Sequence, residues 1–194
     1  MDYFIKIPTY DADTKLWLHT IYNTREEFVE FLKSIFKEPG QYGFDDTSFK
    51  FNEQARLFNK NRFYCAAPQR SKDFIHYWDT EKEKCRMGVI FKSKGNTWYL
   101  SRDYYMWLNF LPIYNKEIAR FGFPDVRDAQ YHMALYEDLA KYSYKHVAIL
   151  KKRQIASSYY HAAKMINGYW FEEGWVNKIA ASLKDYINEK NKLI

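Results

Sequence analysis

The sequence contains little cysteine and no long apolar run, and each shortage excludes a class of structure. Only 2 of its 194 residues are Cys. Cys65 and Cys85 stand in unrelated contexts, so the sequence predicts neither a disulfide framework nor a zinc site built on paired cysteines. The five histidines are scattered, and none stands beside a carboxylate at a metal-ligand spacing. We therefore expect no metal site made of protein side chains alone.

The first residues also lack the features of a secretory leader. Residues 1–8 carry no apolar core of signal-peptide length, and no later stretch approaches the length of a membrane span. These absences predict a cytosolic protein that is not embedded in a membrane.

Aromatic residues and positive charge are abundant. The aromatic fraction is 20%, with 18 Tyr, 15 Phe and 6 Trp, which is enough to build a sizeable core and argues against a disordered chain. The net charge of +6 suits a nucleic-acid partner or solvated basic helices, and the second is the commoner explanation of a modest excess. The length allows one domain, or one domain with an arm.

Local patterns predict alternating strands and helices in the first hundred residues. Residues 15–22 alternate as a strand does, and Thr24-Arg25-Glu26-Glu27 is a capping box that starts a helix over 28–36. Mixed polar and apolar stretches predict helices at 52–61 and 71–84. A turn-rich connection at 92–96 predicts a hairpin between residues 88–91 and 97–100.

A candidate phosphate-binding turn follows in the second half. The apolar residues 146–150 predict a short strand, the basic run 151–158 predicts a loop, and residues 159–166 predict a helix. Asn167-Gly168 breaks this helical pattern, and residues 171–194 predict another helix. A strand, a tight basic loop and a helix N-terminus together present backbone N–H groups and a positive dipole to an anion. The ordinary pattern G-x-x-x-x-G-K-[ST] is not met. The alternative is a basic strand end that leads into a helix capped by Ser157 or Ser158.

This run, Lys151-Lys152-Arg153-Gln154-Ile155-Ala156-Ser157-Ser158, resembles the degenerate P-loop of phage terminase large subunits, the motors that package DNA into procapsids. In that family a run such as R-Q-x-G-K-[ST] replaces the glycine-rich form, and in some members the lysine stands at the start of the loop. Laid on that pattern, Ala156 takes the glycine place, Ser157 the lysine place and Ser158 the terminal Ser/Thr place. Lys151 takes the displaced-lysine place. Ala156 departs from the family pattern, since a Cβ costs roughly 1 kcal/mol if the position needs a positive φ.

Two upstream segments resemble the same family. Residues 104–113, Tyr-Tyr-Met-Trp-Leu-Asn-Phe-Leu-Pro-Ile, are similar to a Y-F-x-L-N-x-x-P-I segment that precedes the ATPase core in one branch of these proteins. Residues 123–131 follow, in the same order as in that branch. Gln130 stands where related motors carry a glutamine that contacts adenine. A glutamine suits this role because its side-chain amide can pair with both the donor and the acceptor edge of adenine. The alternative for Gln130 is an exposed helix residue.

The resemblance implies ATP and Mg²⁺ as cofactors, and ATP hydrolysis coupled to movement of DNA. It implies that Lys151 and Arg153 neutralise phosphate charge, with Ser158 as the magnesium ligand. The loop N–H groups that cradle the phosphate would come from Gln154, Ile155, Ala156, Ser157 and Ser158. The implied partners are double-stranded DNA, the portal protein, the small terminase subunit and further copies in a ring, all in the host cytoplasm.

The fold class expected on this basis is α/β. Residues 1–85 form an N-terminal α+β arm or subdomain, and residues 86–194 form the beginning of a P-loop ATPase domain. No apolar strand ending in Asp-Glu is present to hold magnesium and orient water, and no clustered carboxylates of the terminase nuclease occur. We therefore expect an N-terminal portion of a motor, which binds nucleotide weakly by itself and does not turn it over.

Two other functions fit the sequence. A non-enzymatic, basic and aromatic-rich module for nucleic acid or capsid would explain the charge without any nucleotide. A degenerate P-loop kept only as a scaffold would explain the serine in the lysine place. The aromatic cluster Tyr99, Tyr104, Tyr105, Trp107 and Phe110 is favoured as core packing over base stacking.

Overall fold

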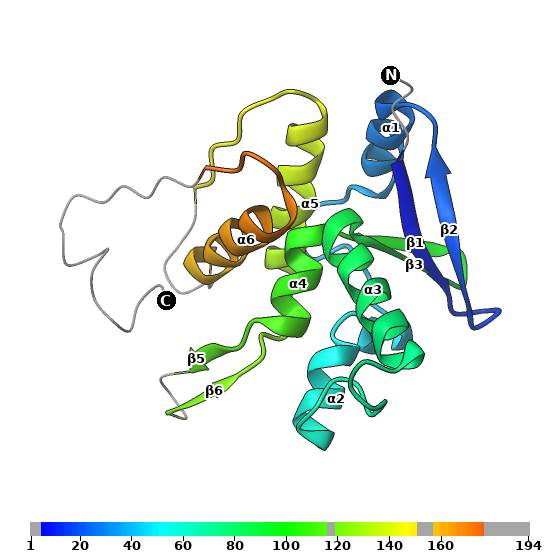
Figure 1. Cartoon of the computed structure of the whole chain (residues 1–194). Helices are drawn as coiled ribbons and strands as arrows, with labels where there is room; N and C mark the ends of the chain where they lie inside the picture. Colours follow the sequence, from blue (N-terminus) through cyan, green and yellow to red (C-terminus); the bar gives the residue numbers. More distant parts are fainter. Residues whose placement is uncertain (1–4, 116–118, 151–156, 177–194) are drawn as a thin grey trace.

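The computed structural model describes residues 5–115, 119–150 and 157–176, which form a mixed α/β fold (Figure 1). Four strands make the main sheet in the order β2-β1-β3-β4. Two antiparallel hairpins, β1–β2 and β3–β4, are joined in the middle by the parallel pair β1–β3. Their bounds are Ile5–Asp11 for β1, Leu16–Tyr22 for β2, Val89–Ser93 for β3 and Asn96–Leu100 for β4.

The hairpin expected around residues 92–96 is confirmed, with a tighter turn than the sequence predicted. The strands continue to Ser93 and Asn96, and only Lys94 and Gly95 lie between them. Both turn residues have positive φ, 48° and 79°, as a two-residue turn of type I′ requires. That turn matches the right-handed twist of the strands, so it fixes the register of β3 on β4. The strand predicted at 15–22 is also confirmed, as β2.

Helix α1 (Arg25–Ile35) begins at the expected capping box. The Thr24 side chain accepts the backbone N–H of Glu27 at 3.1 Å, and the Glu27 carboxylate accepts the N–H of Asn23 at 2.8 Å. The buried face of α1 brings Phe28 against Tyr99 of β4. Helix α1 thereby covers the face of the sheet that includes Tyr99.

A long crossover connects the two hairpins and covers the opposite face of the sheet. It contains the short 3₁₀ helix η1 (Asp46–Lys50), α2 (Glu53–Asn61) and α3 (Lys72–Met87), which confirms both helices predicted for this region. Phe91 follows Ile90, the partner of Tyr99, and so points to the other face. There Phe91 contacts Trp17, and the ammonium of Lys84 in α3 lies over the Trp17 ring.

Three further helices pack beside the sheet. Helices α4 (Arg102–Phe110) and α6 (Ser157–Phe171) lie against each other, and α5 (Asp128–Tyr142) lies between α1 and α4 (Figure 1). A small hairpin, β5 (Ile113–Asn115) and β6 (Arg120–Gly122), projects away from them. Residues on both sides of the expected boundary at 85 contribute to the sheet and to one hydrophobic core.

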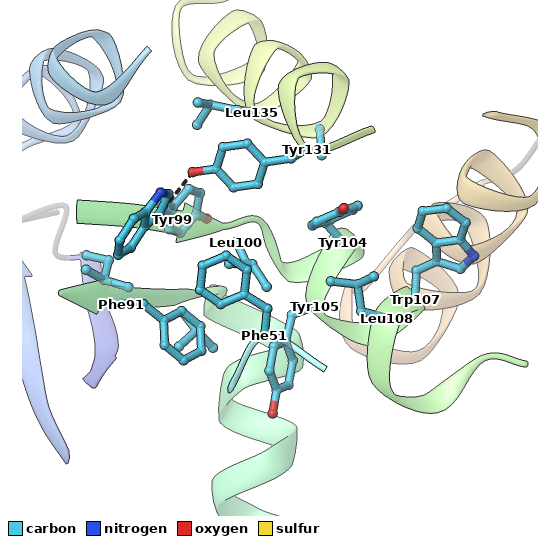
Figure 2. Packing of buried hydrophobic residues seen from close by; sticks show 14 of the residues in the cluster. Phe51, Phe91, Tyr99, Leu100, Tyr104, Tyr105, Trp107, Leu108, Tyr131 and Leu135 are labelled. Carbon is cyan, nitrogen blue, oxygen red and sulfur yellow. Dashed lines mark hydrogen bonds between the residues drawn. The ribbon is translucent and has the colours of Figure 1, made fainter. Parts of the chain in front are cut away.

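The aromatic cluster near the middle of the chain is core, as favoured. Tyr99, Tyr104, Tyr105 and Trp107 are each no more than 3% exposed, which leaves no ring face open to a base. Figure 2 shows these rings between the sheet and the helices, with Phe51 and Tyr131 closing the cluster. Rings of this size supply much of the apolar burial that stabilises the fold.

Three predictions about the second half are wrong for the described residues. Residues 146–150 form no strand, and Ile149 and Leu150 are exposed, because no strand of the described sheet lies beside them. Helix α6 does not break at Asn167-Gly168. The Asn167 side chain donates to the Cys85 carbonyl at 2.8 Å, and the bare Gly168 backbone receives the Trp175 ring. The helix predicted from 171 onward is absent at residues 172–176, and residues 177–194 lie outside the described part.

Candidate nucleotide site

Two of the segments that resemble terminases, and the helix that follows the third, meet in one layer of helices. Tyr104 in α4 packs on Tyr131 in α5 and on Tyr160 in α6, with ring centroids 6.2 and 6.1 Å apart. Trp107, one turn along α4, lies 5.6 Å from the Tyr160 ring. All four rings are buried. The layer places the start of α6, and hence the end of the candidate loop, on a rigid aromatic base.

The candidate loop itself lies mostly outside the described residues. This holds for Lys151, Arg153, Gln154, Ile155 and Ala156. Ser157 and Ser158 are the first two residues of α6 as it is described, and they differ in exposure. Ser157 is buried at 4%, whereas Ser158 is exposed. Of the two hydroxyls, the Ser158 hydroxyl is therefore the one open to a ligand at the helix N-terminus, where the dipole favours anions.

A polar contact fastens the first turn of α6 to α5. His161 Nδ1 lies 2.7 Å from the Ser157 carbonyl, and its Nε2 lies 2.9 Å from a Glu137 carboxylate oxygen. Since both partners are acceptors, both ring nitrogens donate, which describes a protonated imidazole. The hydrogen bond that His161 donates to Glu137 raises the pKa of His161, and burial opposes that rise. Lys164 Nζ binds the other Glu137 oxygen at 2.5 Å.

A second polar group lies where α4, α5 and the end of α6 converge. Arg102 pairs with Glu172 just after α6, and its Nε lies 3.4 Å from an oxygen of the buried Asp103. Burial raises the pKa of Asp103 to about 7, while the Arg102 charge opposes the rise. Burial also raises the pKa of Asp138, which accepts the Tyr99 hydroxyl at 3.2 Å.

Sequence reasoning missed this charged layer. The signal that could have found it is the presence of carboxylates inside otherwise apolar helical stretches, as with Asp103 in α4 and Glu137-Asp138 in α5. Such residues are rarely buried unless they are paired. Asp103 pairs with its neighbour Arg102 on α4, whereas the pairing of Glu137 with Lys164 joins α5 to α6 and depends on how these helices pack.

Gln130 lies in the first turn of α5 and is buried at 5%. It is therefore not the exposed helix residue of the alternative interpretation. Its backbone N–H donates to the Arg127 carbonyl at 3.1 Å, within the helix start. In the same turn, the Asp128 carboxylate accepts the backbone N–H of Gly40 at 2.5 Å, which ties α5 to the segment after α1.

No group of three or more histidine, cysteine or acidic side chains in the described ranges is arranged to hold a metal ion. A magnesium ion at Ser158 would take its other ligands from the nucleotide phosphates and from water, as is usual for this cation.

No family model, no curated protein and no solved structure matches the chain. In the described part of the chain, none of the helices has both the length and the apolar character needed to cross a lipid bilayer.

Proposed function

We propose that this chain is the N-terminal portion of a phage terminase large subunit, which binds ATP with Mg²⁺ at residues 151–158 and uses it to move double-stranded DNA into a procapsid. The observation that carries the proposal is the contact of Tyr104, Tyr131 and Tyr160. Tyr104 and Tyr131 belong to two segments that resemble the family, and Tyr160 lies two residues after the third, in the helix that this segment leads into. Segments chosen by their letters alone have no reason to be neighbours, whereas parts of one nucleotide-binding unit do.

Within this proposal the loop and the start of α6 share the work on the phosphates. Lys151 and Arg153 neutralise phosphate charge, and the backbone N–H groups from Gln154 to Ser158 cradle the β-phosphate. The exposed hydroxyl of Ser158 is the magnesium ligand. The contacts of His161 hold the first turn of α6 in place, so the N–H groups there are oriented before the nucleotide arrives.

The wider assembly follows from the same proposal. The working motor is a ring of copies on the portal protein, supplied with DNA by the small terminase subunit in the host cytoplasm. The acid that orients the attacking water and the nuclease belong to sequence beyond these 194 residues.

The test is binding of a fluorescent ATP analogue with magnesium to the 194-residue chain and to three variants. We expect Lys151→Ala to abolish binding and Ser158→Ala to abolish its dependence on magnesium. Lys145→Ala is the matched control, because Lys145 is an exposed lysine six residues before the loop lysine. Equal loss in Lys145→Ala, or no binding by the parent chain, would reject the nucleotide site. The non-enzymatic basic module would then be the working hypothesis.

A further inference from the structure

The positive charge of the chain is concentrated in one short stretch. Residues 54–72 contain five basic side chains and no acidic one, so the rest of the chain carries 25 basic against 24 acidic residues. The net excess of +6 is therefore almost entirely the excess of this stretch. It runs from α2 through the connecting loop to the start of α3, at the bottom of Figure 1.

The five cations are all directed to solvent. Arg56 and Lys60 stand four residues apart and share one face of α2. Arg62 ends that helix, and Arg70 and Lys72 flank the residue that caps α3. All five are exposed, and none of them makes an ion pair with another residue of the described ranges. We call these five residues the α2–α3 basic face.

The loop that carries part of this face is packed in place. Tyr64 lies 4.7 Å from the Phe58 ring of α2 and 5.1 Å from the Phe110 ring at the end of α4. Its ring also contacts Trp78 of α3 at 5.9 Å. The Tyr77 hydroxyl donates to the buried Gln54 amide at 2.6 Å, which joins α3 to α2. The backbone that carries the cations is thus held in place, so this segment does not have to fold on binding.

We propose that the α2–α3 basic face binds the phosphate backbone of double-stranded DNA. Exposed lysines and arginines without ion-pair partners neutralise phosphates and release counterions, which supplies affinity without reading the base sequence. The inference rests on the proposed function for its partner, DNA, and adds the surface that holds it. This surface is formed by residues 56–72 and shares no residue with the nucleotide loop at 151–158.

The test is fluorescence anisotropy of a labelled duplex of about 20 base pairs, with EDTA and without nucleotide, over about 50 to 200 mM salt. The test variant is Lys60→Gln/Arg62→Gln/Arg70→Gln. The control is Lys6→Gln/Lys37→Gln/Lys92→Gln, which also loses three positive charges from exposed positions. Because both variants have the same net charge, any difference between them reports position. Circular dichroism checks that both are folded.

We expect the test variant to bind roughly tenfold or more weakly at low salt and to lose about two to three units of the log–log salt slope, one for each phosphate contact removed. The control should bind within about twofold of the parent chain. Equal weakening in both variants, or no duplex binding by the parent chain, would overturn the proposed surface. Binding to single strands but not to the duplex would also overturn it.

Since the assay contains no nucleotide, its outcome is separate from that of the ATP site. Loss of DNA binding in the test variant with no ATP binding by the parent chain would leave the basic face standing and remove the nucleotide site. The reverse pattern would remove the basic face and leave the proposed ATP site intact.

Discussion

His161 on α6 donates a hydrogen bond from Nε2 to the Glu137 carboxylate on α5 at 2.9 Å. The same ring holds the Ser157 carbonyl with its other nitrogen, so one side chain ties the first turn of α6 to a neighbouring helix. The pKa of Glu137 is lowered by His161 and Lys164, although burial alone would raise it. The pair is therefore charged on both sides, and its strength depends on pH.

We predict that His161 titrates above its usual pKa of about 6.5. The hydrogen bond to the Glu137 carboxylate raises the pKa of His161, so Glu137→Gln should lower that pKa. The Lys164 charge opposes the rise, so Lys164→Gln should raise it further. NMR titration of the His161 ring measures both shifts. The opposite signs are the control: variants that move the pKa in the same direction would contradict the described contacts.

This raised pKa also fixes the direction of a stability change. The folded protein holds the His161 proton more tightly than the unfolded chain, so the stabilisation is complete below pH 6.5 and is lost as the pH rises through the folded pKa. Urea unfolding of the parent chain and of His161→Gln, between pH 5 and 9, should show the two stabilities converging at high pH. A constant difference would assign His161 a packing role alone.

A second pH effect is expected from Asp103, with the opposite origin. Burial raises its pKa from 3.8 to about 7, so between those values the folded protein keeps a proton that the unfolded chain has released. The contribution of this carboxyl to stability therefore falls as the pH rises from about 4 to 7. Asp103→Asn cannot ionise and should exceed the parent chain in stability at pH 8 by on the order of 4 kcal/mol.

Urea titrations at several pH values measure this difference, which should vanish near pH 4. Asp125→Asn is the control, because the Asp125 side chain is 80% exposed and its carboxyl lies 3.8 Å from Arg127. It should stay within about 0.5 kcal/mol of the parent chain throughout. An Asp103→Asn variant that is less stable than the parent chain at pH 8 would show instead that the carboxyl is stabilised in its charged form.

The edge of the sheet offers a third prediction. The Tyr131 hydroxyl accepts the backbone N–H of Tyr99 in edge strand β4 at 3.1 Å (Figure 2). Tyr131→Phe leaves that buried N–H without its acceptor, which should cost about 1 to 3 kcal/mol in the free energy of unfolding. Tyr144→Phe, at a side chain that is 82% exposed, should cost less than about 0.5 kcal/mol. Chemical denaturation compares the two, and equal costs would contradict the prediction.

Substitutions at two glycines, Gly88 and Gly95, can distinguish the cost of backbone strain from the cost of a steric clash. Gly88 and Gly95 have nearly the same φ, 78° and 79°. A Cβ at Gly88 would stand 2.5 Å from the Leu100 carbonyl oxygen, whereas a Cβ at Gly95 meets nothing within 4 Å. Gly95→Ala should therefore cost only the conformational strain, about 1 to 2 kcal/mol. Gly88→Ala should cost at least about 1 kcal/mol more, because β4 must move. Thermal unfolding of both variants measures the difference.

Local signals predicted the first half of the fold well. The capping box at Thr24 and the turn around Gly95 are decided by residues next to them in the sequence, and both appear as expected. The prediction of a strand at residues 146–150 was wrong because a strand forms only beside a neighbour with which it can pair, and an apolar run in the sequence does not show whether such a neighbour exists. The parallel pairing of β1 with β3 was beyond reach for the same reason: it joins residues on either side of a long crossover.

The sequence predicted where the candidate site lies along the chain, but not the contacts that hold it against the neighbouring helices. Sequence patterns placed the start of a helix close to Ser157, where α6 is described as beginning. They did not reveal that Ser157 is buried and Ser158 exposed, since that depends on how α6 packs on α4 and α5. The break expected at Asn167 was wrong because its amide finds a carbonyl acceptor on α3, at Cys85, far away in the sequence.

The parallel pair in the middle of the sheet also sets the order of folding events. Each hairpin closes locally, which takes on the order of microseconds. Thr9 and Ile90, which lie opposite each other in β1 and β3, are about eighty residues apart, so joining the hairpins requires closing a long loop. During synthesis, the edge of β1 that pairs with β3 therefore stays unpaired until β3 has left the ribosome. That interval is when the nascent chain is most exposed to aggregation, and a chaperone is expected to matter most then.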